Sequence, residues 1–184
     1  DAGLAFIHWL TGEDNLHYGL WDGLAPVAAN LRAAQAAYTE KLFALLPPGR
    51  LRILDIGGGA GVTAAKLMAL GHEVEIIVPS AFLAERCRAN APGAVVHECR
   101  FEDFTSEARF DLCLFSESFQ YIPLEVGLAK CAQLLAPGRR GADWRLLPLR
   151  CLHQPRGPRA QARRRAQAAR LSGAAAHPAL RAAP

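Results

Sequence analysis

The chain has 184 residues and a mean hydropathy of +0.07, which suits one domain with its own apolar core. It contains no apolar run of about 18 residues and no basic-then-apolar leader, so we expect a cytoplasmic protein without a membrane span. The net charge of +4 is the sum of two unequal parts: −6 over residues 1–138 (10 Lys and Arg, 16 Asp and Glu) and +10 over residues 139–184 (11 Arg, one Asp).

The first 50 residues predict two helices separated by an aromatic-rich loop. The letters FIHWL at 6–10 fit the end of a helix, and DNLHYGLWDG at 14–23 fits a loop. Residues 24–46 are rich in Ala and Leu, with apolar residues at helical spacing, and predict a long helix. The sequence PPG at 47–49 ends this helix.

From residue 50 to residue 138, predicted strands and helices alternate. This alternation indicates βαβ units, a parallel sheet and right-handed crossovers. We therefore predict an α/β fold: a Rossmann-like, doubly wound parallel sheet with helices on both faces, truncated after the fourth strand and its helix. The predicted strands are RLRILDI (50–56), HEVEIIVPS (72–80), AVVHEC (94–99) and RFDLCLF (109–115); the predicted helices are 60–71, 80–90 (with Ser80 as N-cap) and 123–138.

Residues 139–184 depart from this pattern, which places a domain boundary at residue 138. They are built mostly of Arg, Ala, Pro, Gly and Leu and contain no Val, Ile or Thr, so a further central strand is hard to build. The segment is interpretable as a nucleic-acid or membrane-surface binder, as a disordered tail, or as a frameshifted product of GC-rich DNA. We favour the frameshift, and we do not expect nucleic acid as a partner because interleaved aromatic residues are missing.

The first residue and the cysteines lead to two further expectations, one about the domain boundary and one about metals and disulfides. The chain begins with Asp1 rather than Met, so we interpret residues 1–138 as an N-terminally incomplete domain. The five cysteines form no CxxC pair and have no metal-ligand spacing with histidine. We therefore expect reduced thiols and no metal.

The stretch LDIGGGAG at 54–61 is the candidate ligand-binding segment. Glycines between a first strand and a helix let a ligand approach the main chain closely, at a helix N-terminus. A dinucleotide fingerprint GxGxxG would need a third glycine where Val62 stands. The observed pattern, from Asp55 to Gly61, places an acid and then glycines at alternating positions.

In this form ILDIGGGAG resembles the first motif of class I S-adenosylmethionine-dependent methyltransferases. Further segments match that family in order, and the resemblance covers roughly residues 14–138. HYGLW at 17–21 is similar to a loop in a small-molecule subgroup that includes relatives of the cyclopropane-fatty-acid and sterol enzymes. The other matching segments are EIIVPS (75–80), RFEDF (100–104), RFDLCLFSESFQYIP (109–123) and LLAPG (134–138).

The resemblance implies a cofactor site around the first two strands. Asp55 would hold the amino-acid end of S-adenosylmethionine, although a helix-capping acid is the alternative. Val78 stands where the family has an acid for the ribose hydroxyls, so either Ser80 and backbone groups hold the ribose or the affinity is low. The glycines implied beneath the cofactor are Gly57, Gly58, Gly59 and Gly61, of which Gly61 has helix packing as its alternative role.

The resemblance implies further residues at the adenine end and the methyl end of the cofactor. Phe101 and Glu102, with Asp103 as an alternative acceptor, fall where the family reads adenine. Tyr18 would contact the cofactor. His17 and Glu117 are the candidate catalytic residues, with a structural role as the alternative for each. Gln120 and Tyr121 would line the acceptor pocket.

The predicted function is S-adenosylmethionine-dependent methyl transfer to a small-molecule acceptor by in-line displacement, in which the enzyme mainly aligns the reactants. One alternative is an NAD-binding oxidoreductase, against which the missing third glycine and the missing acid at position 78 both count. Another is an inactive fragment or a basic-tailed binding protein. The sequence determines neither the acceptor nor the oligomeric state.

Overall fold

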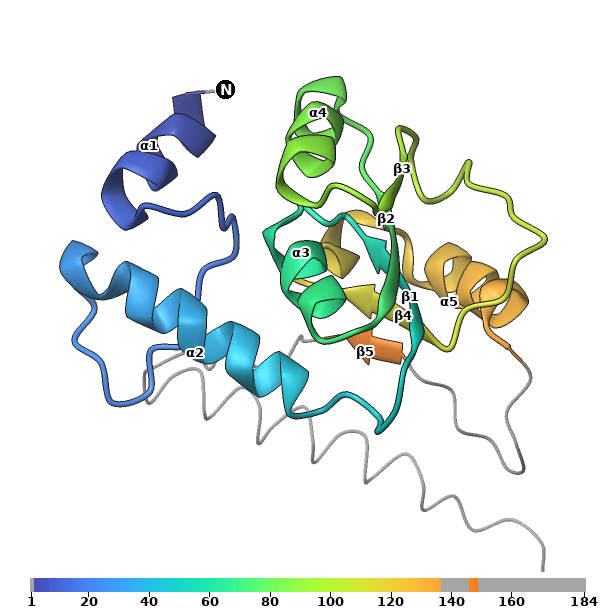
Figure 1. Cartoon of the computed structure of the whole chain (residues 1–184), viewed down its shortest axis with the longest axis horizontal. Coiled ribbons are helices and arrows are strands. Elements are labelled where there is room, and N and C mark those ends of the chain that lie inside the picture. Colours follow the sequence, from blue (N-terminus) through green and yellow to red (C-terminus); the bar gives the residue numbers. More distant parts are fainter. Residues whose placement is uncertain (1, 137–145, 149–184) are drawn as a thin grey trace, which may run out of the picture. The chain divides into compact units, whose positions relative to one another are not determined.

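The structure is a computed structural model that describes residues 2–136 and the backbone of residues 146–148 (Figure 1). Its centre is a parallel sheet in the order β3-β2-β1-β4-β5, which confirms the predicted α/β, Rossmann-like class. The strands are β1 (Arg52–Ile56), β2 (Glu73–Ile77), β3 (Val95–His97), β4 (Leu112–Phe115) and β5 (Leu146–Pro148). The helices are α1 (Ala2–Thr11), α2 (Leu31–Phe43), α3 (Val62–Ala69), α4 (Ala81–Asn90) and α5 (Leu124–Leu134), with 3-10 turns η1 (Ala28–Asn30) and η2 (Phe119–Tyr121).

The strands bury side chains on both faces of the sheet. Ile53 of β1 and Ile76 of β2 pack into a cluster with residues of α2, α3 and α4. Leu54 and Ile77 point the other way, into a second cluster with residues of α5. Figure 1 shows α3 and α5 on opposite sides of the strands. Near-continuous apolar strands are typical of such doubly covered parallel sheets, and the prediction of helices on both faces is confirmed.

The strand order creates a switch point between β1 and β4. The chain forms β1, β2 and β3 in one direction across the sheet, then returns to the other side of β1 to form β4. The loops that follow β1 and β4 therefore leave the sheet in opposite directions, and a crevice opens between them at the carboxyl ends of the strands.

Local signals mark two helix ends as predicted. Ser80 caps α4, where its Oγ accepts a hydrogen bond from the Leu83 amide at 3.4 Å. Gly71 ends the α3 segment with φ of +91°, a left-handed conformation that suits glycine after a helix. The long helix predicted over 24–46 is shorter than expected, because the regular α-helix spans only Leu31–Phe43. Pro26 explains part of this difference, since the residue before a proline avoids the helical region.

The C-terminal end of the sheet differs from the prediction that the sheet stops after the fourth strand. Residues Leu146–Pro148 pair with β4 in parallel, with Cys113 opposite Leu146. A short edge strand needs only backbone donors and acceptors on one side, and its terminal proline is tolerated at such an edge. The rest of the predicted tail lies outside the described residues, so its interpretations stay predictions.

Candidate functional site

A pocket of about 270 Å³ opens at the switch point between β1 and β4. Three segments form most of its wall: the loop after β1, the loop after β4 and the N-terminal loop that follows α1. The lining residues are Asp14, Asn15, Leu16, His17, Tyr18, Asp55, Gly57, Gly58, Gly59, Ala60, Val62, Thr63, Val78, Pro79, Leu83, Ser116, Glu117, Ser118, Gln120 and Tyr121.

The glycine loop after β1 forms the floor of the pocket and leaves no room for a side chain at Gly57 or Gly58. Gly57 has φ of +74°, and a Cβ added there would collide with the side chain of Ser118. A Cβ added at Gly58 would lie 2.7 Å from Oδ2 of Asp55. Both positions therefore require glycine because neighbouring side chains lie too close for a Cβ. Gly57 is also required by its left-handed backbone conformation. Gly61 lies outside the lining, where an added Cβ would come within 2.9 Å of Cys87 Cα in α4; its role is helix packing.

Asp55 lies beneath this loop as a buried acid. Its side chain is 0% exposed, and both carboxylate oxygens lack a hydrogen-bond partner among the described residues. Burial raises the pKa of Asp55 to about 7, because a low-dielectric environment disfavours the charged form. An unsatisfied buried carboxylate is costly, so this position fits a donor that arrives with a ligand or a water.

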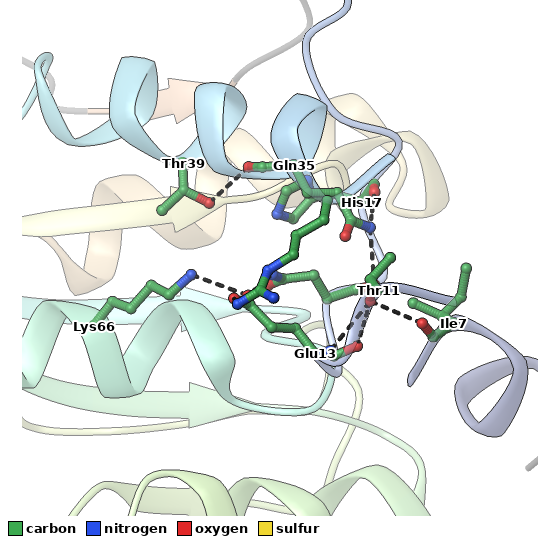
Figure 2. A network of polar contacts seen from close by, with 9 residues as sticks. Ile7, Thr11, Glu13, His17, Gln35, Thr39 and Lys66 are labelled. Carbon is green, nitrogen blue, oxygen red and sulfur yellow. Dashed lines mark hydrogen bonds and ion pairs between the residues drawn. The ribbon is translucent and has the colours of Figure 1, made fainter. Parts of the chain in front are cut away.

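The N-terminal loop is fixed to three helices, and Figure 2 shows the contacts from α2 and α3. Gln35 of α2 is buried and donates from Nε2 to the carbonyls of Asn15 (3.1 Å) and His17 (2.9 Å). Glu13 pairs with Lys66 of α3 at 3.3 Å and with Arg32 of α2 at 3.5 Å. Asn90 of α4 donates to Asp14 (3.2 Å) and to the carbonyl of Ala60 (3.0 Å), which joins this loop to the glycine loop.

His17 reaches the pocket as a buried, neutral imidazole. Its ring stacks on Tyr38 with centroids 4.4 Å apart, and neither ring nitrogen has a partner among the described residues. Burial, followed by the positive charge of Lys66, lowers the pKa of His17 to about 4. A group with so low a pKa is a weak general base near neutral pH, so the geometry favours the structural role over the catalytic one.

Glu117 and Tyr18 meet where the N-terminal loop approaches the loop after β4. The Tyr18 amide donates to Oε2 of Glu117 at 3.0 Å, and both residues line the pocket. Gln120 and Tyr121 of η2 continue the same wall. The structure thus brings together His17, Tyr18, Asp55, Gly57, Gly58, Gly59 and Glu117 from the predicted site.

Four predicted cofactor residues do not line this pocket: Gly61, as described above, and Ser80, Phe101 and Glu102. Ser80 is not part of its lining, since its hydroxyl caps α4. Phe101 is buried in the cluster under α5, where it meets Phe115 edge to face. Glu102 pairs with Arg100 at 2.8 Å. Val78 lines the pocket, so an apolar side chain stands at the position implied for the ribose acid.

Several lining residues were not singled out from the sequence. Asp14, Asn15 and Leu16 come from the loop before His17, and Ser116 and Ser118 flank Glu117. The two serines carry a recognisable signal, because hydroxyl residues directly follow a buried strand. Ser118 donates to the carbonyl of Ile56, and Ser116 donates to the Tyr38 hydroxyl at 3.4 Å.

No three His, Cys, Asp or Glu side chains among residues 2–136 gather closely enough to bind a metal ion. Within the same part of the chain, no helix combines the length and the apolar character needed to cross a bilayer.

The chain is similar to known methyltransferases. Residues 53–138 match the family model described as a methyltransferase domain. The chain is 32% identical over 91 residues to the tRNA 5-carboxymethoxyuridine methyltransferase of Escherichia coli (strain K12), a match that covers 45% of this chain and 35% of that protein. It is 35% identical over 94 residues to the ubiquinone biosynthesis O-methyltransferase of Nitrobacter winogradskyi, covering 48% and 36% of the two chains.

A solved structure supports the fold. The geranyl diphosphate C-methyltransferase from Streptomyces coelicolor A3(2), in complex with Mg²⁺, geranyl diphosphate and S-adenosyl-L-homocysteine, superposes with a TM-score of 0.61 at 18% identity. The match covers 74% of this chain and 61% of that one. By contrast, the two curated relatives are matched over only 35% and 36% of their length.

Proposed function

Residues 53–138 match the family model of a methyltransferase domain, and from this match we propose that the chain is a class I S-adenosylmethionine-dependent methyltransferase that acts on a small-molecule acceptor. The observation that carries the proposal is the pocket at the β1–β4 switch point, with the glycine loop as its floor and Asp55 beneath it. The solved relative with bound S-adenosyl-L-homocysteine has the same fold, which supports a cofactor of this kind.

The residues present fit S-adenosylmethionine. Gly57, Gly58 and Gly59 offer a surface without side chains, against which a flat, extended ligand can lie. Asp55 has two unpaired oxygens for the donors at the amino-acid end, directly or through water. Tyr18 closes the pocket from the opposite loop. When bound, the cofactor supplies a methyl group on a positively charged sulfur, a leaving group that is already activated.

The chain itself contributes to the reaction by aligning the acceptor with the methyl group of the cofactor. An in-line displacement needs the acceptor atom, the methyl carbon and the sulfur in a row, and fixed walls contribute by removing the freedom of both reactants. The three wall segments are tied to the sheet and to helices α2, α3 and α4, which restricts their movement. A neutral His17 adds a polar but uncharged group to this wall.

The open side of the pocket suggests the kind of acceptor. Tyr18 is 61% exposed and Tyr121 is 77% exposed, and both line the pocket, as does the half-exposed Leu16. Such an aromatic and apolar rim favours an acceptor with an apolar or aromatic body. We also propose a cytoplasmic location, as the sequence suggested, and no nucleic-acid partner.

Calorimetric titration of the full 184-residue chain tests this function. We expect heat of binding with S-adenosylmethionine and S-adenosylhomocysteine and none with NADH. Gly57→Ala should abolish the heat, because its Cβ cannot coexist with Ser118. Gly23→Ala serves as the matched control, since Gly23 has a similar φ of +76° but nothing within 4 Å of its added Cβ. Binding of NADH alone would contradict the proposal.

A further inference from the structure

The loop after β4 joins three different parts of the fold through three consecutive residues. Ser116 contacts the Tyr38 hydroxyl of α2, and Ser118 contacts the carbonyl of Ile56 at the end of β1. Between them, Glu117 reaches the N-terminal loop, where its Oε2 accepts the Tyr18 amide at 3.0 Å. The two flanking contacts fix the loop to the sheet and to α2, so Glu117 extends from a firmly anchored base.

The backbone at Glu117 is unusual. With φ of +63° it is the one non-glycine residue in the left-handed region across the part of the chain that the structure describes. Side chains make this region unfavourable, and residues found there are over-represented at functional sites. This conformation places the Glu117 carboxylate against the opposite wall of the pocket.

The opposite wall is itself well positioned to receive this contact. Gln35 fixes the carbonyl of His17, one residue before Tyr18, and the Trp21 ring nitrogen donates to the carbonyl of Tyr18 at 2.9 Å. The Tyr18 amide therefore meets Glu117 from a segment in which the carbonyls of His17 and Tyr18 are both held by hydrogen bonds. The bond joins two segments that are 99 positions apart in sequence and that line one pocket.

We propose that Glu117 is a positioning residue that latches the N-terminal loop, residues 14–18, to the loop after β4 and so closes one side of the pocket. The latch needs a hydrogen-bond acceptor at this position and no proton transfer. This assignment differs from the catalytic role considered from the sequence, in which the carboxylate would remove a proton from the acceptor. Its effect on cofactor release rests on the proposed function, whereas its effect on the loop does not.

Hydrogen exchange measured by mass spectrometry on the full chain without cofactor tests the latch directly. We expect Glu117→Ala to raise the exchange rate of the Tyr18 amide about tenfold, and Glu117→Gln, which keeps an acceptor oxygen, to change it less than about threefold. Glu107→Ala, an exposed acid outside the pocket, should leave it unchanged. Glu117→Gly keeps the left-handed backbone without strain and replaces the alanine variant if that variant does not fold.

Release of S-adenosylmethionine, followed by a chase experiment, is the second readout. The alanine or glycine variant should release the cofactor about tenfold faster than the glutamine variant. Unchanged Tyr18 exchange in Glu117→Ala would overturn the latch, and so would a glutamine variant that exchanges as fast as the alanine variant. If the wild-type chain binds no cofactor, the proposed function fails, but the exchange measurement still decides the latch.

Discussion

At the scale of single residues, the site is defined by groups whose surroundings do not suit them. Among the described residues, neither the Asp55 carboxylate nor the His17 imidazole has a hydrogen-bond partner, although both are buried, and Glu117 bears a side chain in a left-handed conformation. Each is unfavourable for folding in isolation. All three line one pocket, which is the pattern expected where stability is given up for ligand binding.

The pH dependence of stability tests the burial of Asp55. Its pKa is raised from 3.8 to about 7, so the folded state binds the proton more tightly than the unfolded state. Stability contributed by this group is present below pH 4 and is lost as the pH rises towards 7, by at most about 4 kcal/mol. Asp55→Asn should therefore be more stable than the wild type at pH 7 and should lose that advantage at pH 4, as measured by urea unfolding.

Two controls accompany this measurement. His17 changes the free energy of unfolding with pH in the opposite direction. Its pKa is lowered from 6.5 to about 4, so the stabilisation from its neutral form is lost as the pH falls through that range. The His17 contribution is the same in the wild type and in Asp55→Asn, so it cancels in the difference between their free energies of unfolding. Asp103→Asn, at an exposed acid, is the matched control for the loss of one carboxylate. An Asp55→Asn profile parallel to the wild type would show that the acid is solvated.

At the scale of elements, the N-terminal loop is the least regular wall of the pocket and depends on polar contacts with its neighbours. Glu13 accepts a hydrogen bond from Asn15 at 2.7 Å and pairs with Lys66 and Arg32. Figure 2 shows Lys66 and Gln35 approaching this segment from two different helices. Partly exposed ion pairs of this kind contribute about 0.2–1 kcal/mol each and weaken as salt is added.

Glu13→Gln tests this anchoring. We expect the variant to lose about 1 kcal/mol of stability at low salt and to exchange the amides of residues 13–18 faster, since both ion pairs lose their charge. The difference from the wild type should shrink at 1 M NaCl. Glu40→Gln, at an exposed acid on α2, is the matched control. A salt-independent difference would indicate that hydrogen bonds rather than charges anchor the loop.

At the scale of the whole molecule, the sheet and the loops that line the pocket belong to one compact unit, so a ligand of the pocket should stabilise the fold. At a concentration one hundred times the dissociation constant, a bound ligand adds about 2.7 kcal/mol to the free energy of unfolding. We expect S-adenosylmethionine to raise the melting temperature of the wild-type chain by several degrees, measured by calorimetry, and NADH to leave it unchanged. A melting temperature that responds equally to both would contradict a site selective for the sulfonium cofactor.

The parts that the sequence predicted are those with local causes. Alternating apolar strands and helices indicated the parallel sheet, Ser80 and Gly71 marked helix ends, and the acid–glycine pattern from Asp55 marked the floor of the pocket. Three residues assigned to the site by motif position alone lie outside this pocket, and their roles in cofactor binding stay predictions. Ser80, Phe101 and Glu102 are used by a helix cap, by the core and by an ion pair.

The sequence by itself determined the class of the fold and the kind of glycine loop after β1, and it indicated the resemblance to methyltransferases, because periodicity and motif spacing are local properties of the chain. Only the tertiary structure decided which side chains share the pocket and what state they are in there. Burial of Asp55 and His17, and the contact between Glu117 and Tyr18 across 99 positions, depend on segments that meet only after the sheet has formed. Desolvation and long-range hydrogen bonds arise from that packing, and no window of sequence contains them.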